Sequence, residues 1–432
     1  MSPAGAAWRD YREAAAAFSR PARLFLTSTL LAWAGYGVNQ VLFNLYLVEG
    51  GFQEGFIGRV ISLNGLGLAL AALPAGWLAE RRGRRFCLVL GALVFGSGHL
   101  MRSVFLVPGA VYAGSFLSGV GQALTAIAAA PFLTEHSTAR ERTHLFSVFF
   151  AAELLAGVIG SLLGGWMPAA LRGLPDGFRP TLLLAYRITL VTGALLDFAS
   201  LLPLRRLRGL AEAPFAQERQ RIEPRERRKL YPIAVNAFLI GAGAGLVIPF
   251  MNLYFKTRFD CSSAQIGIFF SVAQVGTAFA MLMGPIAARR VGKLRTAIAL
   301  QLLSLPFLVT LGAEKHLEFA VAAFWMRAAL MQASTPLLGA FVMETLPPAL
   351  RARSASFTNL VWNVGWATSA TLAGVVIQRF GYAVPFYMTA TLYAAAALWF
   401  YRSFRGVAEA GPPETRLSDE AKGLRGEGPM TE

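Results

Sequence analysis

The sequence is poor in charged residues and in cysteine. Only 15% of its 432 residues are charged, and only two are cysteines. Disordered chains carry more charge, and disulfide-stabilised scaffolds carry more cysteine. Hydrophobic residues instead make up 55% of the chain, which is more than ordinary soluble domains contain. The composition therefore argues against these two classes and against a soluble enzyme.

Signals of enzyme chemistry are also scarce. The four histidines are scattered along the chain without the spacing of metal ligands. The phosphate-binding sequence G-x-x-x-x-G-K-[ST] does not occur, so nothing points to an ATP-driven motor. We therefore expect no enzyme activity, no cofactor and no metal site.

Long apolar runs dominate the sequence. Each is about 20 residues long, which is the length of a helix that crosses a bilayer. The runs cover residues 24–48, 56–79, 86–107, 109–133, 144–168, 181–204, 232–256, 264–288, 293–313, 317–343, 354–378 and 383–403. They are continuous and do not alternate, which favours helices over a β-barrel. The sequence predicts an all-α polytopic membrane protein with twelve transmembrane helices.

Positive charge is concentrated on one side of the predicted helices. About three quarters of the 40 lysine and arginine residues fall on one side if both termini are cytoplasmic. The net charge of +16 then reflects topology and contact with anionic lipids of the cytoplasmic leaflet, and no nucleic acid partner is expected. The first run has full span length and lacks a cleavage pattern, so we expect no signal peptide. We predict a monomeric, multi-pass protein of the plasma or inner membrane.

The apolar runs divide the chain into five segments. Residues 1–23 form a cytoplasmic segment in which residues 6–20 are either an interfacial amphipathic helix or a frayed helical tail. Residues 24–204 and 232–403 are two six-helix halves, joined by a polar cytoplasmic linker at 205–231. Residues 404–432 are predicted to be a flexible cytoplasmic tail.

The two halves share a repeated sequence. Residues 43–46 (FNLY) correspond to residues 251–254 (MNLY), and further matches continue at an offset of 207 to 209 residues. Near the ends of spans four and ten, Glu135 and Arg140 recur as Glu344 and Arg351. An even number of spans per half gives both halves the same orientation, related by an axis along the membrane normal. The sequence therefore predicts a duplicated six-helix unit.

The loop between spans two and three carries a ten-residue motif. Residues 76–85 read GWLAERRGRR, which resembles the major facilitator superfamily signature G-x-L-A-D-R-x-G-R-R with Glu80 in place of Asp. Together with the twelve spans and the repeat, the chain resembles this family over essentially its whole length. The second-half counterpart, 284–293 (GPIAARRVGK), lacks the acid. The resemblance implies two pseudo-symmetric six-helix halves and secondary transport by alternating access.

The same resemblance implies that this loop is a conformational latch. Glu80 can pair with a basic residue or a helix N-terminus only when the cytoplasmic side is closed. Glu135 and Glu344 are expected to cap the inner gate with Arg140 and Arg351. The predicted latch set is Gly76, Glu80, Arg81, Gly83, Arg84, Glu135, Arg140, Glu344 and Arg351. The alternative is a positively charged loop that only sets topology.

Polar side chains recur at helical spacing inside several spans, where burial makes them costly. The resemblance places the transport site near mid-membrane, between the halves. Its candidate walls are Tyr36, Asn39, Gln40 and Asn44 in span one, Gln122 in span four, Gln274 in span eight, and Asn359, Trp362, Asn363 and Trp366 in span eleven. Any one of them can instead be a hydrogen bond that holds helices together.

Two charged residues lie deep in the predicted spans, Glu153 in span five and Arg327 in span ten. Glu153 shares a helical face with Gly157, Gly160 and Gly164, and we expect this face at the interface between the halves. A carboxyl group held away from water favours its neutral form and can carry a proton. The alternatives are a structural ion pair of Glu153 with Arg327 and a permanently protonated Glu153.

Three further charged residues in the spans, Arg102, Arg187 and Asp197, are expected to be peripheral. We therefore predict a secondary active transporter of a small organic solute, with proton-coupled export of amphipathic compounds as the favoured form. The alternatives are a sugar or metabolite importer, a lysolipid translocator of the same fold, and a membrane sensor that transports nothing.

Overall fold

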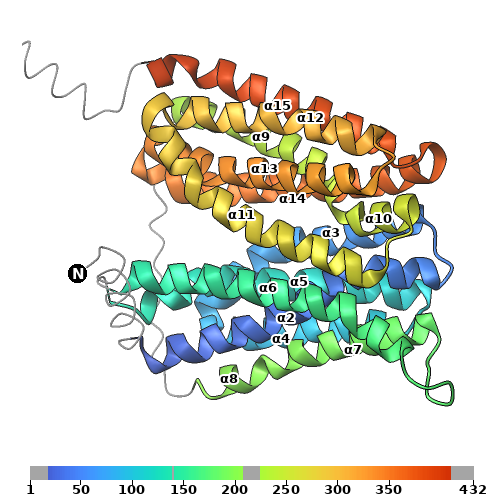
Figure 1. The fold of residues 1–432 in the computed structure, drawn as a ribbon. Helices are drawn as coiled ribbons and strands as arrows, with labels where there is room; N and C mark the ends of the chain where they lie inside the picture. The colour runs from blue at the N-terminus through green and yellow to red at the C-terminus, as the bar shows by residue number, and fades with distance from the viewer. Residues whose placement is uncertain (1–17, 139–140, 208–223, 410–432) are drawn as a thin grey trace, which may run out of the picture.

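The computed structural model is a bundle of long helices (Figure 1). The structure describes residues 18–138, 141–207 and 224–409. Within these residues the chain forms helices and no strands, which confirms the predicted all-α class. The predicted interfacial helix at 6–20 and most of the linker and C-terminal tail lie outside the described residues.

The helices follow the predicted spans in order. The first half contains α2 (Arg20–Glu49), α3 (Glu54–Arg82), α4 (Arg84–Val104), α5 (Pro108–Glu135), α6 (Arg142–Arg172), α7 (Leu182–Ala199) and the short α8 (Leu201–Arg205). The second contains α9 (Pro224–Val247), η1 (Ile248–Phe250), α10 (Met251–Phe259), α11 (Ser263–Val291), α12 (Lys293–Ala313), α13 (Leu317–Thr345), α14 (Pro348–Phe380) and α15 (Ala383–Glu409). Segments α7 with α8, and α9 with η1 and α10, each make one span.

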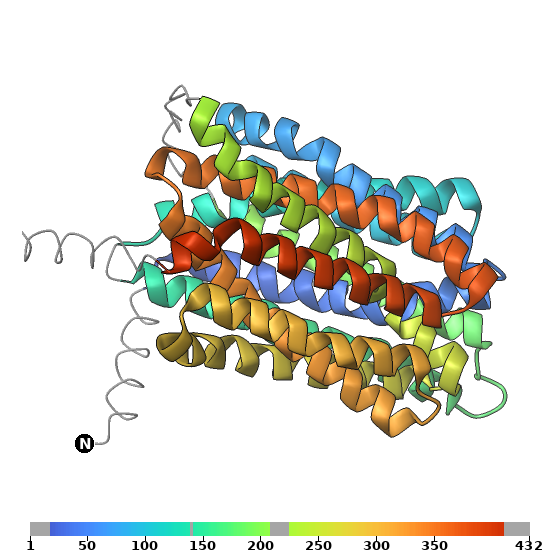
Figure 2. The ribbon, with the colours of Figure 1, turned by 90° about the horizontal axis from the view of Figure 1, so that it is seen from above.

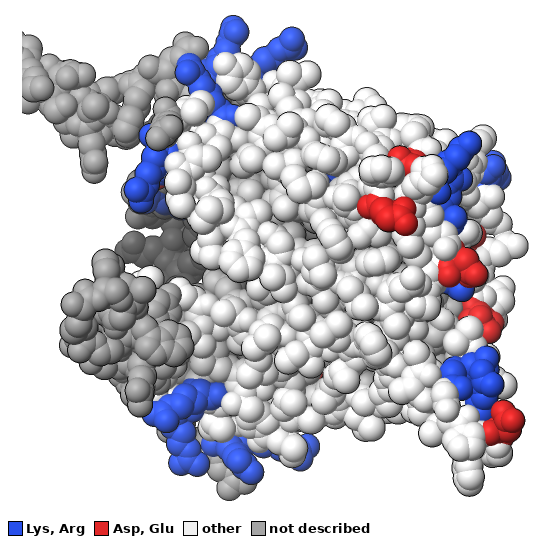
Figure 3. Space-filling view, in the orientation of Figure 1, with Lys and Arg blue, Asp and Glu red and all other residues white. Residues whose placement is uncertain are grey.

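The bundle has the surface of a membrane protein. In the described part of the chain, ten helical segments are long and apolar enough to cross a membrane. Helices α2 and α13 match them in length but carry more polar side chains, among them Asn39, Asn44 and Arg327. Charged side chains gather at the two ends of the bundle and leave an uncharged belt between them (Figure 3).

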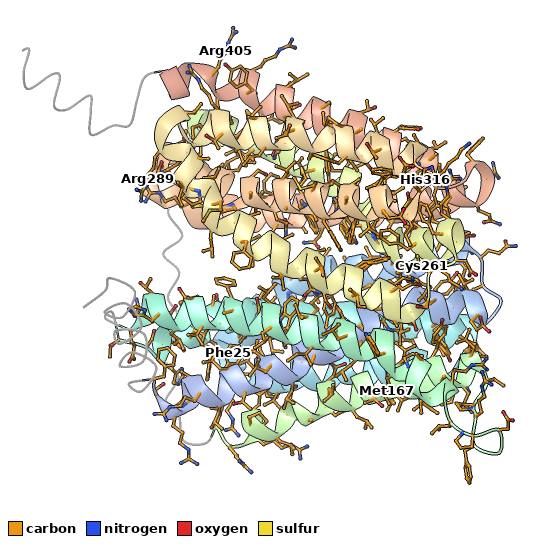
Figure 4. The ribbon with its side chains drawn as sticks, in the orientation of Figure 1. Phe25, Met167, Cys261, Arg289, His316 and Arg405 are labelled. Atoms are coloured by element: carbon orange, nitrogen blue, oxygen red, sulfur yellow. The ribbon has the colours of Figure 1, made fainter. Side chains whose placement is uncertain are left out.

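Both described chain ends lie at the same end of the bundle, as the view onto the second half shows (Figure 2). We call it the terminal end. Arg289 and Arg405 lie there, whereas Cys261 and His316 lie toward the opposite end (Figure 4). On the face drawn in Figure 3, the described charges at the terminal end are basic, while the opposite end carries both signs. This is the asymmetry that the sequence predicted.

The sequence repeat is present in the structure as equivalent contacts. Tyr46 Oη donates a hydrogen bond to the Ser103 carbonyl (2.8 Å), and its counterpart Tyr254 donates to the Leu311 carbonyl (2.7 Å). Gly83 and Gly292 occupy the same turn in the two halves, with φ of 88° and 90°. Side chains other than glycine rarely adopt this conformation, so the glycine is needed at both turns.

The two halves are joined by a symmetric hydrogen-bonded pair, which we call the Asn44–Asn252 clamp. Asn44 Nδ2 donates to Asn252 Oδ1 (3.2 Å) and to the Pro249 carbonyl (2.6 Å). Asn252 Nδ2 donates to the Val41 carbonyl (2.9 Å). Each amide therefore reaches the carbonyl three residues before the other asparagine, as expected when a pseudo-twofold axis passes between them.

Further hydrogen bonds between the halves lie toward the same end of the bundle. Ser263 Oγ of α11 donates to the Gly165 carbonyl of α6 (2.9 Å), and Thr371 Oγ1 of α14 donates to Ser62 Oγ of α3 (2.6 Å). At the terminal end, α11 diverges from α6 (Figure 1), and the surface is hollowed between the halves (Figure 3). The bundle is closed at one end and open at the terminal end.

Removing the Asn44 amide should favour opening of the closed end. Asn44→Ala leaves buried polar groups of the clamp without partners, at a cost of about 1–3 kcal/mol. This corresponds to roughly a 5- to 150-fold change in the equilibrium between conformations. The measurement is labelling of a single cysteine at Ile57, fully buried in α3, by an impermeant thiol reagent added from that side.

The background for this experiment replaces Cys87 and Cys261 by serine. Asn363→Ala is the control, because the Asn363 amide bonds only to Asn359 on its own helix. Equal labelling rates in both variants would contradict the clamp's role.

Candidate functional site

A cavity of about 170 Å³ lies inside the first half. Its walls come from α2, α4, α5, α6, α7 and α8. Two carboxyl groups line it, those of Glu153 and Asp197. The other functional groups are aromatic rings (Phe25, Trp33, Tyr36, Phe95 and Phe149) and hydroxyl or amide side chains (Ser28, Thr29, Gln122, Thr125 and Ser200). Phe25, one of the lining residues, lies in the half of the bundle toward the terminal end (Figure 4).

The volume of the cavity limits what it can hold. Pockets for organic ligands usually measure about 300–1,000 Å³, whereas a water molecule occupies about 30 Å³ of liquid. A cavity of about 170 Å³ therefore has room for several waters but is too small for a drug-sized solute. It is a chamber with mainly apolar walls, among which carboxyl, hydroxyl and amide groups are interspersed.

Glu153 lies in the wall of this cavity. Its carboxylate accepts a hydrogen bond from the Trp33 indole, and the Trp33 and Tyr36 rings pack edge to face at 5.3 Å. A drug-sized solute does not fit here, but a proton can reach a carboxyl group through water. Within the described residues, Glu153 forms no ion pair with Arg327.

The glycine face next to Glu153 lies elsewhere than predicted. Gly160 packs against the backbone of Ala34 and Gly37 in α2, and Gly164 packs against Val38 of the same helix. Of the predicted face, Gly157 alone contacts the second half, through the Gln274 side chain. The expectation that this glycine face lies between the halves is therefore wrong for Gly160 and Gly164, because the backbone of α6 packs against α2 there, but Gly157 does contact the second half.

A buried polar network borders the cavity. Asp197 Oδ2 lies 2.7 Å from His99 Nδ1, which lies 3.3 Å from Asn39 Nδ2. Arg102 donates to Asn39 Oδ1 (3.0 Å) and to Ser115 Oγ (3.3 Å). All five side chains are buried. We call these residues the His99–Asp197 network.

Two expectations from the sequence are overturned here, because Arg102 and Asp197 are central to the first half and not peripheral. Helix α7 packs against both α2 and α4, so the inward faces of α4 and α7 meet in the middle of the half. Arg187 does pair locally, donating to Tyr46 Oη (3.1 Å). The signal that could have found the network is the presence of a histidine, a basic and an acidic residue in two spans of one half: His99 and Arg102 in span three, and Asp197 in span six.

The other predicted wall residues do not form one site. Asn39 belongs to the network, Asn44 belongs to the clamp, and Gln274 Nε2 donates to Ser161 Oγ across the halves (3.0 Å). Tyr36, Gln122 and Glu153 line the cavity, whereas Gln40 is exposed.

The candidates in the second half lie on two helices. On α14, Asn363 Nδ2 donates to Asn359 Oδ1 (2.7 Å), and the Trp362 and Trp366 rings stack at 5.1 Å. Arg327 of α13 is only 5% exposed and interacts electrostatically with Tyr393 of α15. These residues are separate from the first-half cavity.

The loop residues form ion pairs within each half. Arg84 pairs with Glu135, and the equivalent Lys293 pairs with Glu344. Arg351 Nε instead donates to the Leu346 carbonyl (3.2 Å), and Arg140 lies outside the described residues. Both acids therefore bind the first turn of a neighbouring helix in their own half.

The remaining latch residues are not engaged in this conformation. Glu80 is exposed and, among the described residues, has no ion-pair partner. The Arg81 guanidinium lies over the Trp77 ring at 4.4 Å, and Gly76 has no close neighbour.

Comparison with known families agrees with this architecture. The sequence profile of the Major Facilitator Superfamily matches residues 25–232 and again residues 233–427. The chain belongs to the major facilitator superfamily. The match and the apolar helices together identify an integral, multi-pass membrane protein of this transporter family.

Two relatives of this superfamily protein match over part of its length. A zebrafish (Danio rerio) protein named solute carrier family 2, facilitated glucose transporter member 12 is 33% identical over 129 residues, covering 30% of this chain and 20% of the relative. The 4-hydroxybenzoate transporter PcaK of Acinetobacter baylyi is 29% identical over 159 residues, covering 33% and 34%. The matches span about a fifth and a third of the relatives.

Solved structures share the fold over most of this superfamily protein. A bacterial homologue of the lysosomal transporter Spinster, inward-facing and occupied, aligns with a TM-score of 0.73 at 14% identity, covering 89% of this chain and 96% of that one. The nucleoside transporter NupG gives 0.71 at 15% identity, covering 89% and 99%. A D-xylose–proton symporter gives 0.67 at 14% identity, covering 88% and 95%.

If Glu80 is a latch, its loss should favour the conformation that is open at the terminal end. Glu80→Ala removes a charged contact worth about 0.3–1 kcal/mol in the closed form. Labelling of a cysteine at the exposed Asn359 from that side should rise by about two- to five-fold. Glu135→Ala is the matched control, since Glu135 is already paired in the open form. An unaltered labelling rate in Glu80→Ala would contradict the latch role and would indicate that the loop only sets the membrane topology.

Proposed function

We propose that this protein is a secondary active transporter that exports small amphipathic organic solutes in exchange for protons. The observation that carries the proposal is the unequal contact between the halves. The Asn44–Asn252 clamp closes one end, while the latch residue Glu80 at the other end is unengaged. Alternating access requires a protein that can exchange such contacts between its two ends.

The terminal end is assigned to the cytoplasm in this proposal. Its support is the excess of basic residues there, since cytoplasmic loops of membrane proteins are enriched in lysine and arginine. Exposed arginines such as Arg81 and Arg82 would then contact anionic lipids. On this assignment the structure is an inward-open state, in which solute enters from the cytoplasm.

The favoured solutes are neutral or cationic and amphipathic. The proposed pathway combines aromatic and amide side chains with the carboxyl group of Glu153, which disfavours anions by charge repulsion. Its members are Tyr36, Asn39, Gln40, Asn44, Gln122, Glu153, Gln274, Arg327, Asn359, Trp362, Asn363 and Trp366. The chamber beside the pathway supplies the water through which protons move.

Glu153 is the proposed proton carrier, so Glu153→Gln should abolish uphill transport. The glutamine keeps the size of the side chain and a hydrogen-bond acceptor for Trp33 but cannot release a proton. We expect solute movement driven by a pH gradient in proteoliposomes to fall to the level of protein-free vesicles. Solute exchange at equal pH on both sides should persist.

Glu49→Gln is the control for this experiment, because Glu49 is an exposed carboxyl at the end of α2, outside the cavity. Undiminished pH-driven accumulation by Glu153→Gln would remove Glu153 as the carrier.

A sugar or metabolite importer is the second candidate. Its support is the partial similarity to a glucose transporter and to a 4-hydroxybenzoate transporter. Amide and tryptophan side chains on α14 can also bind hydroxyl groups.

A ligand-dependent thermal shift screen of the purified protein separates these candidates. A compound present at 100 times its Kd stabilises the native state by about 2.7 kcal/mol, which raises the Tm measurably. We expect cationic and neutral amphipathic aromatics to raise the Tm. Stabilisation by sugars or by lysolipids alone would overturn the proposed solute class in favour of that compound class. No stabilisation by any class would favour a sensor that transports nothing.

A further inference from the structure

One buried carboxyl group at the edge of the chamber has an incomplete set of partners. Asp197 is 1% exposed and lines the cavity. Its Oδ2 contacts His99 Nδ1, but its Oδ1, which packs against Gly35 of α2, has no hydrogen-bond partner among the described residues. A buried carboxylate oxygen usually accepts at least one hydrogen bond. The ionised form of Asp197 is thus incompletely satisfied beside a space large enough for water.

The orientation of the Asn39 amide is set by Arg102. A guanidinium group only donates hydrogen bonds, so the Asn39 atom at 3.0 Å from it must be the oxygen. The NH₂ group of Asn39 therefore points at His99 Nδ1, at 3.3 Å. This fixes a donor on one side of that ring nitrogen.

His99 Nδ1 has two polar neighbours with conflicting requirements. When Nδ1 carries a hydrogen, it donates to Asp197 Oδ2 at 2.7 Å but faces the Asn39 donor. When Nδ1 is bare, it accepts from Asn39 or from a protonated Asp197, but it cannot donate to a carboxylate. The geometry supports two proton arrangements, and neither satisfies every group.

We propose that the His99–Asp197 network is a proton-binding site, at which Asp197 takes up a proton from chamber water onto Oδ2, the oxygen that faces His99 Nδ1. The inference rests on the proposed proton coupling and adds a second titrating group to Glu153. Loading adds one proton, forms one O–H bond on Oδ2 that donates to the bare Nδ1 of His99, and converts the carboxylate to a neutral carboxyl group. On unloading, the same proton returns to chamber water.

Loading changes the charge balance of the network. Asp197 interacts electrostatically with Arg102, so a neutral Asp197 leaves the Arg102 charge without its nearest counter-ion. The remaining partners of Arg102 are the neutral Asn39 and Ser115 and the Phe43 ring, which lies 3.9 Å below the guanidinium. Arg102 is then held mainly by α2, which carries both Asn39 and Phe43.

The groups around Asp197 come from every helix packed against α7. Helix α2 provides Tyr36 and Asn39, α4 provides His99 and Arg102, and α6 provides Glu153 across the cavity. Helix α8 and, across the cavity, α5 provide no titratable group among the lining residues. Glu153 and Asp197 share one hydrated space, so a proton can pass between them through water.

Helix α2 connects this site to the gate. Asn39 of the network and Asn44 of the clamp lie five residues apart on the same helix, with Phe43 between them under Arg102. A change in how Arg102 holds α2 therefore acts on the segment that closes the far end. The helices equivalent to α4 and α7 carry no such group, since α12 has no charged residue beyond Arg295 and α15 has no acid before Glu409.

Infrared difference spectroscopy tests the site without knowledge of the solute. Spectra of the purified full-length protein in liposomes, taken between mildly acidic and mildly alkaline buffer, report the carbonyl band of protonated carboxyl groups. We expect the wild type to show a titrating band that Asp197→Asn lacks. Asp176→Asn, which removes an exposed loop carboxyl, should keep it.

A second variant guards against misfolding of Asp197→Asn. His99→Gln keeps Asp197 but removes the imidazole, so the band should remain while its frequency and titration midpoint shift. A structural ion pair that never changes its protonation would give no titrating band assignable to Asp197. That result, or an identical band in wild type and Asp197→Asn, would overturn the inference.

Transport separates failure of the site from failure of the proposed function. With a solute found by the thermal shift screen, Asp197→Asn should retain exchange but lose accumulation driven by a pH gradient. Wild-type transport that moves no protons would contradict the proposed proton coupling, independently of the infrared spectra. Proton-coupled transport that survives in Asp197→Asn would overturn the role of this site alone.

Discussion

Polar side chains inside this bundle must find their partners on other helices, because hydrocarbon offers none. One buried set is the His99–Asp197 network, which ties α2, α4, α5 and α7 together through one imidazole, one guanidinium and one carboxyl group. The clamp applies the same rule between the halves, where the Asn44 amide donates to Asn252 Oδ1 and each of the two amides donates to a backbone carbonyl of the other half. Helix α2 takes part in both, so the packing of the first half and the closure of the gate depend on the same helix.

The duplication provides the symmetric framework on which this arrangement is built. Equivalent tyrosines, glycine turns and ion pairs recur in the two halves: Tyr46 with Tyr254, Gly83 with Gly292, and Arg84–Glu135 with Lys293–Glu344. The ionisable groups depart from this symmetry. Asp197 and Glu153 lie in the first half, while the second half buries Arg327 beside Tyr393. The scaffold is therefore symmetric, whereas the buried ionisable groups are not, and the proposed proton sites lie in the first half alone.

The spans, the repeat and the family could be predicted because each depends on local or periodic features of the chain. An apolar run of span length has one stable environment, and a ten-residue motif is recognised without knowledge of the fold. The site could be predicted only in part. Glu153 was found by its depth in span five, but its glycine neighbours were assigned to the wrong interface, since Gly160 and Gly164 pack on α2 of the same half.

The sequence by itself determined the number of membrane spans, their order, the duplicated halves and the side on which positive charge gathers. Only the tertiary structure decided which buried charges meet, because this depends on the rotation of each helix about its axis and on contacts between residues far apart in the chain. His99 and Asp197 are 98 positions apart, and Asn44 and Asn252 are 208 apart. A mean hydropathy over a span does not reveal single polar residues, whereas helix packing brings such residues to hydrogen-bonding distance.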